Sequence, residues 1–131
     1  MPHLTLEYTM NLDEWASDPG LLLNLHRVLE SVAGIKIGNC KSRWRMVEDW
    51  VVGDGEGESA FVHLDIRFLE GRRLEIQRAV GAGAVELLRA HFASAPDELD
   101  LQITVEVHEI RRSTYFKHPP GTLGPPTLSV V

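Results

Sequence analysis

The stretch Gly53-Asp54-Gly55-Glu56-Gly57 lies near the middle of the chain and divides it into two similar parts. Glycine adopts turn conformations at little cost, so this stretch suits a hairpin turn. Strand-like sequence lies on both sides. Residues 40–52 are rich in Trp, Val and Met, and residues 61–68 alternate between polar and apolar side chains. The stretch therefore predicts a hairpin between two strands at the midpoint of the chain.

The part before the midpoint has the pattern of a strand, a helix and a strand. Residues 3–9 alternate in polarity, which is typical of a half-buried strand. A helix is expected to begin at Pro19, with Asp18 as its N-cap, and to end at Gly34, because apolar side chains recur between them at spacings of three and four. Residues 40–52 then supply the second strand.

The part after the midpoint repeats this pattern. The strand over residues 61–68 is broken at Gly71, and a helical stripe of apolar side chains follows from Arg72 to about Phe92. Residues 101–108 alternate as a last clear strand, and residues 113–116 are a candidate for a short additional one. The sequence thus predicts a duplicated β-α-β arrangement, an α+β fold.

The duplication predicts the layers of the molecule, with halves over about residues 2–52 and 60–116. Right-handed crossovers make the strands of each half parallel and place both helices on one face of a single mixed sheet. The other face needs a cover, and other copies of the chain are its natural source. We expect one domain over residues 1–118, an oligomer, and a proline-rich tail over residues 119–131 that is extended or disordered.

Composition narrows the class of protein. The chain has 131 residues, of which 44% are hydrophobic and 24% charged, and its formal net charge is -6. This negative charge argues against a general binder of nucleic acid or of anionic membranes. Cys40 is the only cysteine, and the sequence shows neither a signal peptide nor an apolar stretch of roughly 20 residues. We therefore expect a soluble, cytoplasmic protein.

Pro2 is the first candidate for chemistry, because it directly follows the initiator Met1. Removal of Met1 would make the ring nitrogen of Pro2 a free secondary amine, a base with a pKa somewhat above the value of about 7.7–8 usual for α-amines. The alternative is that Pro2 only begins a strand, where it need not donate a ladder hydrogen bond. Other features of the sequence distinguish between the two interpretations.

Two groups of cationic side chains favour the catalytic interpretation. No carboxylate lies between Ser31 and Val47, and a second group surrounds Arg72. Nearby positive charge and partial burial would lower the pKa of an amine towards neutrality, which suits a group that accepts and then donates a proton. The alternative for both groups is a solvated surface. The residues are Lys36, Lys41, Arg43 and Arg45 in the first group and Arg67, Arg72, Arg73 and Arg78 in the second.

Short motifs in a fixed order link these features to a known family. They are Met-Pro-His at 1–3, Pro-Gly-Leu at 19–21, Lys-Ser-Arg at 41–43, Ala-Phe-Val-His at 60–63, Gly-Arg at 71–72, His-Phe at 91–92 and Phe-Lys at 116–117. With these motifs the chain resembles the tautomerase superfamily, and within it the 5-carboxymethyl-2-hydroxymuconate isomerases. The resemblance implies a trimer of β-α-β-β-α-β subunits. It also implies a cofactor-free shift of a conjugated double bond, with the N-terminal proline as acid and base.

Matched residue by residue, the resemblance places the proline on Pro2 and one carboxylate-binding arginine on Arg72, and we predict both to be catalytic. The other arginine position is Lys41, a candidate for substrate binding. Lysine keeps the charge but lacks the planar fork that grips a carboxylate through two hydrogen bonds. Arg43, on the same strand face, is a candidate to replace it. His63 and Phe116 are further candidates for substrate binding, with a hydrogen bond at the strand surface and apolar packing as their respective alternatives.

No metal or other cofactor is predicted. His3, His63 and His108 lie on the polar sides of predicted strands, and none has the close spacing of zinc ligands. The predicted function is therefore a cofactor-independent tautomerase or isomerase. Its substrate would be a small anionic acid of aromatic catabolism, an unsaturated 2-hydroxy or 2-oxo (di)carboxylic acid. A hydratase or decarboxylase using the same proline, and a non-catalytic trimeric ligand-binding module, remain alternatives.

Overall fold

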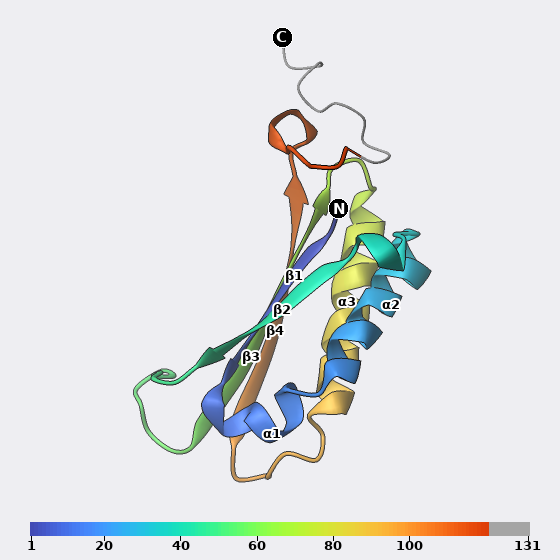
Figure 1. The fold of residues 1–131 in the computed structure, drawn as a ribbon. Helices are drawn as coiled ribbons and strands as arrows, with labels where there is room; N and C mark the ends of the chain where they lie inside the picture. Colours follow the sequence, from blue (N-terminus) through green and yellow to red (C-terminus); the bar gives the residue numbers. More distant parts are fainter. Residues whose placement is uncertain (121–131) are drawn as a thin grey trace.

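The computed structural model describes residues 1–120, which form a four-stranded sheet with two long helices on it (Figure 1). From residue 121 on, the expected tail over 119–131 lies outside the described residues. The longer elements are β1 (His3–Thr9), α1 (Asp13–Ala16), α2 (Pro19–Ala33), β2 (Lys41–Val47), β3 (Ser59–Leu69), α3 (Leu74–His91) and β4 (Asp100–Ile110). Three single turns of 3₁₀ helix accompany them, η1 (Met10–Leu12), η2 (Ile37–Asn39) and η3 (Arg112–Thr114).

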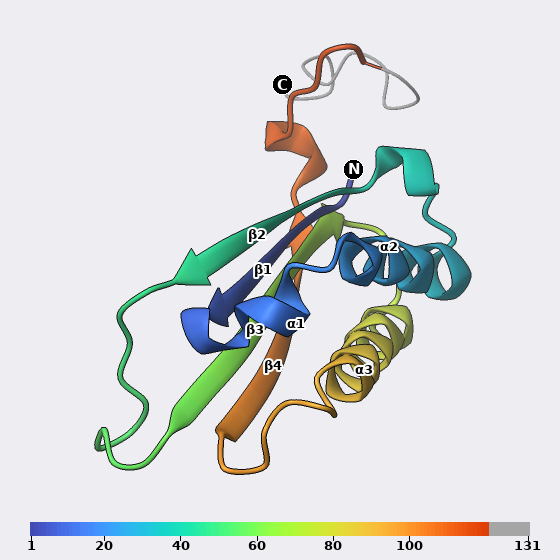
Figure 2. The ribbon, with the colours of Figure 1, turned by 60° about the horizontal axis from the view of Figure 1, so that its bottom comes forward.

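The sheet has the mixed topology that the duplication predicts. Its strand order is β2-β1-β3-β4. β1 pairs in parallel with β2 and β3 pairs in parallel with β4, while β1 and β3 are antiparallel neighbours at the centre. Figure 2 shows α2 and α3 side by side on the same face of this sheet. The α+β fold class, the parallel pairs and the shared helical face are thereby confirmed.

The predicted hairpin at the midpoint is wrong. β1 lies between β2 and β3, so these two strands are not neighbours in the sheet. Residues 48–58 instead form a wide loop that leads from the edge strand β2 to β3, and its three glycines, Gly53, Gly55 and Gly57, have positive φ angles of 58°, 82° and 76°. The glycines do provide turn conformations, but the parallel pairing of β1 with β2 occupies the place that a hairpin would need.

The additional strand considered over residues 113–116 is also absent from the described part of the chain. The 3₁₀ turn η3 takes its place, with a hydrogen bond from the Thr114 N–H to the Arg111 carbonyl at 3.2 Å. The Arg112 N–H donates to the carboxylate of Glu70 at 2.7 Å, so its backbone is already bonded to the end of β3. These N–H groups are therefore not available to a strand ladder.

Local signals explain the bounds of α2, which match the prediction. The Asp18 carboxylate accepts a hydrogen bond from the Gly20 N–H at 2.9 Å, and Pro19 occupies the first helical position. Gly34 ends the helix in the left-handed conformation, with φ 67°. Four leucines then bury one face of the helix against the sheet, namely Leu21, Leu22, Leu25 and Leu29.

The core lies between the sheet and the helices. The predicted apolar faces of β1 and β3 are both fully buried there, and each large side chain contributes roughly 1.5–3 kcal/mol by leaving water. Two glycines let α3 approach its neighbours: a Cβ on Gly81 would lie 3.6 Å from Val107 of β4, and one on Gly83 would lie 3.2 Å from Val28 of α2. The buried strand residues are Leu4, Leu6, Tyr8, Val62, Leu64, Ile66 and Phe68.

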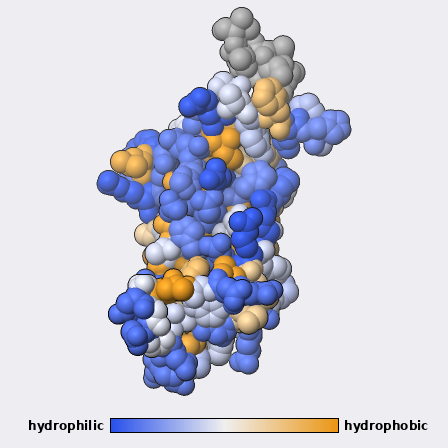
Figure 3. All heavy atoms as spheres, turned by 90° about the vertical axis from the view of Figure 1, so that its left-hand side faces the viewer, coloured by the Kyte–Doolittle hydropathy of each residue, from blue (hydrophilic) through white to orange (hydrophobic). Residues whose placement is uncertain are grey.

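The opposite face of the sheet carries no helix among residues 1–120 and is mostly hydrophilic (Figure 3). Apart from Thr9 and Leu69 at the strand ends, which are buried, residues of β1 and β3 on this face are at most half-buried, and β2 forms an exposed edge. Within the described residues, no helix has the length and apolarity needed to cross a membrane. The uncovered face agrees with the expectation that another copy of the chain covers it.

Candidate active site

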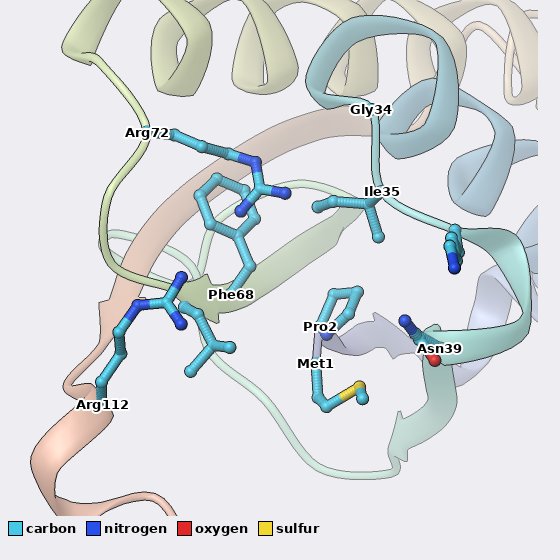
Figure 4. Close-up of a pocket in the computed structure, with 10 residues that line it drawn as sticks. Met1, Pro2, Gly34, Ile35, Asn39, Phe68, Arg72 and Arg112 are labelled. Carbon is cyan, nitrogen blue, oxygen red and sulfur yellow. The ribbon is translucent and has the colours of Figure 1, made fainter. Parts of the chain in front are cut away.

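A cavity of about 370 Å³ lies at the end of the sheet where β1 begins and β3 ends (Figure 4). The C-terminal end of α2 and the loop before α3 complete its wall. Pro2 and Arg72, the two residues predicted to be catalytic, both line this cavity. The lining residues are Met1, Pro2, Gly34, Ile35, Lys36, Asn39, Phe68, Leu69, Arg72 and Arg112.

Pro2 is buried at the entrance to β1. Its carbonyl accepts a hydrogen bond from the N–H of Lys41 at 3.1 Å, which extends the β1–β2 pairing by one residue and fixes the start of the chain. Because proline has no N–H in a chain, this position costs no ladder hydrogen bond. The parallel pairing therefore holds the Pro2 ring in the wall of the cavity.

Arg72 enters the cavity from the turn after β3. Gly71, with φ 124°, provides the sharp change of direction that ends the strand. The Arg72 Nε donates to the carbonyl of Ala33 at 3.2 Å, and the guanidinium carbon lies 5.4 Å from the centre of the Phe68 ring. Figure 4 shows the guanidinium directed towards the cavity, between Phe68 and Ile35. These contacts hold the side chain in place and leave its terminal nitrogens for a ligand.

Arg112 is a second arginine in the cavity, and no pattern in the sequence marks it as a site residue. It belongs to η3, directly after β4, and its Nε donates to the carbonyl of Glu70 at 3.1 Å. Parallel strands end at the same edge of a sheet, so the pairing of β3 with β4 brings Arg112 next to Glu70. The only signal in the sequence was an arginine just after a predicted strand. Lys36 and Asn39 also line the cavity, from the segment before β2.

The cavity disfavours a protonated amine at the N-terminus. Burial is the main cause that lowers the pKa of the Met1 α-amine below its ordinary value of 8.0. The positive charges of Arg72, Lys117, Lys41 and Arg112 lower this pKa further, in that order. An amine at this end of β1 is therefore shifted towards its neutral, basic form.

The structure does not bring the side chains of Lys41 and Arg43 into the wall of the cavity. The Lys41 side chain is exposed at the start of β2, and its positive charge still lowers the pKa of the N-terminal amine. Arg43 is bound on the uncovered face, where its Nη2 lies 3.0 Å from Nδ1 of His3. His3 Nε2 in turn lies 3.0 Å from the Tyr115 hydroxyl. A role of Lys41 or Arg43 in substrate binding remains a prediction.

His63 and Phe116 also lie outside the described lining of the cavity. His63 is opposite Glu7 in the β1–β3 register, so it lies roughly 17 Å along the strand from Pro2 at about 3.4 Å per residue. Phe116 follows η3 and is 59% exposed. Their assignment to substrate binding stays a prediction that the geometry of this chain does not favour.

Comparison with known proteins identifies the family. A family model described as 5-carboxymethyl-2-hydroxymuconate isomerase matches residues 2–120. The chain belongs to this family. Its members include the 5-carboxymethyl-2-hydroxymuconate Delta-isomerase of Escherichia coli, which is 30% identical over 117 residues, covering 89% of this chain and 93% of that protein. The family resemblance predicted from the sequence motifs is thus confirmed, and the chain is an isomerase of the tautomerase superfamily.

Solved structures agree with this membership. A 5-carboxymethyl-2-hydroxymuconate isomerase from Deinococcus radiodurans R1 has a TM-score of 0.80 and 32% identity, covering 88% of this chain and 87% of that one. A symmetric trimer of fused 4-OT has a TM-score of 0.67 at 16% identity, covering 89% and 93% of the two chains. The second likeness shows the fold alone, a tautomerase-type arrangement shared by the isomerase family.

Proposed function

We propose that this isomerase moves a double bond in an unsaturated 2-hydroxy or 2-oxo acid, without a cofactor, and that Pro2 is its acid and base. The observation that carries the proposal is the position of Pro2 in a cavity walled by Arg72 and Arg112, where the pKa of an amine is lowered. Removal of Met1 is part of the proposal, because it releases the ring nitrogen of Pro2 as a secondary amine.

The chemistry is a transfer of one proton between two ends of a conjugated system. The neutral Pro2 nitrogen accepts the proton of the 2-hydroxyl group, and the electron pair of that O–H bond forms the 2-oxo group while the double bonds shift. The protonated amine then delivers the same proton to the distant carbon, which regenerates the neutral base. A single group that both accepts and donates works best with a pKa near the working pH.

The wall of the cavity suits the charge of such a substrate. Arg72 and Arg112 each offer a guanidinium group to a carboxylate, and Arg72 also stabilises the negative charge that develops on the substrate oxygen. One preorganised donor of this kind lowers the activation barrier by about 3 kcal/mol. Ile35, Phe68 and Leu69 provide apolar surface for the carbon chain. A small unsaturated dicarboxylic acid matches this combination.

We further propose that the chain acts as a homotrimer in the cytoplasm, on an acid of aromatic catabolism. The trimer is supported by the symmetric trimer of the fused 4-OT relative and by the uncovered face of the sheet. The substrate class is supported by the name of the Escherichia coli relative, which acts on a hydroxymuconate.

The test combines the mass of the intact chain with an ultraviolet assay. Mass spectrometry shows whether Met1 is removed, and the assay uses 5-carboxymethyl-2-hydroxymuconate, 2-hydroxymuconate and phenylenolpyruvate. Replacement of the secondary by a primary amine in Pro2→Ala should lower kcat by about 10²-fold or more, the usual contribution of a general acid–base group. A processed, folded chain that isomerises none of the three acids contradicts the proposal. Water addition or carbon dioxide release would instead indicate the hydratase or decarboxylase.

A further inference from the structure

A cluster of metal-ligand side chains lies on the uncovered face of the sheet, away from the cavity of Pro2. His63 and Asp65 are alternate residues of β3, and Glu106 and His108 are alternate residues of β4. In the β3–β4 register Asp65 is directly opposite Glu106. The two histidines therefore lie diagonally on either side of a pair of carboxylates, and all four side chains project from the same face.

Three direct contacts join the four side chains. The Nε2 of His63 lies 3.0 Å from Oε1 of Glu106. The Nε2 of His108 lies 2.9 Å from Oδ1 of Asp65 and 3.3 Å from Oε2 of Glu106. One ligand atom from each of His63, Asp65 and Glu106 lies within 4.8 Å of the others. The pairing of β3 with β4 thus brings together side chains that lie 41 to 43 residues apart in the chain.

These separations are close to those of a tetrahedral zinc site. Zinc binds imidazole nitrogen and carboxylate oxygen at about 2.0–2.2 Å, which places neighbouring ligand atoms about 3.4 Å apart. The three nitrogen–oxygen distances, 2.9–3.3 Å, would open by about half an ångström around the ion, while the ligand atoms of His63, Asp65 and Glu106 already lie within 4.8 Å of one another. Within one chain His63 and Asp65 are half-buried and Glu106 is exposed, so small side-chain rotations supply this adjustment.

The His63 ring is already oriented for metal binding. Its Nδ1 lies 2.6 Å from the Thr104 hydroxyl, the residue opposite it on β4. Histidine ligands typically use one nitrogen for the metal while the other donates a hydrogen bond that fixes the ring. With a metal on Nε2, Nδ1 carries the proton and donates a hydrogen bond to the Thr104 hydroxyl.

The charges of the cluster also favour a cation. Like charges directly opposite each other on neighbouring strands are destabilising, and Asp65 and Glu106 are such a pair. Arg67 compensates part of this charge through a bond from its Nε to Oδ2 of Asp65 at 2.8 Å. Arg45 and Glu7 line the adjacent hollow and offset each other in formal charge. The formal charges of Asp65, Glu106 and Arg67 sum to one net negative charge, which favours a bound cation.

We propose that His63, Asp65 and Glu106 bind a Zn²⁺ ion, with His108 as the fourth ligand. Zinc fits better than Mg²⁺ or Ca²⁺, because imidazole nitrogens suit zinc whereas the other two ions prefer oxygen ligands. The site goes beyond the isomerase activity and stands against the expectation of no metal drawn from ligand spacing. The pairing of β3 with β4 brings these four side chains together, although they are not close in the sequence.

The test is calorimetric titration of Zn²⁺ into the full chain, free of tags and treated with chelator. We expect one ion per chain and no comparable binding of Mg²⁺. Removing a ligand in His63→Gln or Glu106→Gln should weaken binding at least tenfold, and Thr104→Val should weaken it about 10- to 100-fold through the lost ring support. Thr104→Val conserves shape at an exposed strand position, so it keeps the test valid if a ligand variant folds poorly.

Two matched controls separate this site from adventitious binding. His26→Gln changes a histidine of α2 that bonds to Ser42, and Glu86→Gln changes an exposed carboxylate of α3. Both should bind Zn²⁺ as the unchanged chain does. A stoichiometry well below one, or equal affinities in Thr104→Val, the folded ligand variants and the controls, would overturn the proposal.

Discussion

Arg112→Ala is the sharpest test of the active site, because only the tertiary structure places this arginine beside Pro2. The variant removes a guanidinium from the cavity wall and the Nε hydrogen bond to the Glu70 carbonyl, while the backbone bond from Arg112 to the Glu70 carboxylate remains. The turn η3 should therefore survive, and the loss should fall on the substrate. A hydrogen bond to a charged group contributes about 1.5–3 kcal/mol, which corresponds to about 10- to 150-fold in kcat/KM.

The assay compares a dicarboxylate with a monocarboxylate. Isomerisation of 2-hydroxymuconate should lose this factor in Arg112→Ala, whereas phenylenolpyruvate, which has one carboxylate for Arg72 to hold, should lose much less. Arg111→Ala is the matched control, because Arg111 is the neighbouring exposed arginine, is outside the described cavity lining and changes the net charge equally. Equal kinetics of the two variants on 2-hydroxymuconate would refute the assignment of Arg112 to the substrate.

Three further predictions concern protonation and stability. Burial and then Arg72 lower the pKa of an amine at this end of β1, so Arg72→Ala should move the midpoint of kcat/KM upward in a pH–rate profile, and an unmoved midpoint contradicts the electrostatic account. Burial, with the hydrogen bond to Asp13, raises the pKa of Tyr8 to about 12 from an ordinary 10.0. Its stabilising contribution should therefore be complete below pH 10 and decline up to about 12, and denaturant titrations of Tyr8→Phe should lack this part of the pH dependence. Loss of the α2 cap in Asp18→Ala should lower the free energy of unfolding by about 0.5–2 kcal/mol, and an unchanged midpoint in urea would show that the cap contributes nothing.

The elements with strong local signals were predictable from the chain. The bounds of α2 follow from Asp18, Pro19 and Gly34, which act within one turn of the helix, and they match the structure. The alternation of β1 and β3 correctly identified their buried faces. The hairpin was wrong because Gly53 and its neighbours report only local flexibility, whereas the partner of a strand is chosen by contacts across the whole sheet.

Some features of the candidate site were likewise predictable from the sequence, and others depend on the fold. Pro2 and Arg72 were found from their chemistry and from the family motifs, and the structure places both in one cavity. His63 lies on the polar face that alternation predicts, and its role in substrate binding stays a prediction, since alternation gives the face of a residue and not its distance along the sheet. Its contacts with Glu106 could not be foreseen, because they depend on the register of β3 with β4.

By itself, the amino-acid sequence determined which segments are helices and strands, which of their faces turn inward, and the family to which the chain belongs. Backbone propensity, capping and polarity act over a few residues, so each of these can be read locally. The tertiary structure alone decided that β1 separates β2 from β3, that Arg112 lines the same cavity as Pro2, and that two histidines meet two carboxylates on the uncovered face. Strand order and register join residues that are far apart in the chain, and only the packing of the complete core selects them.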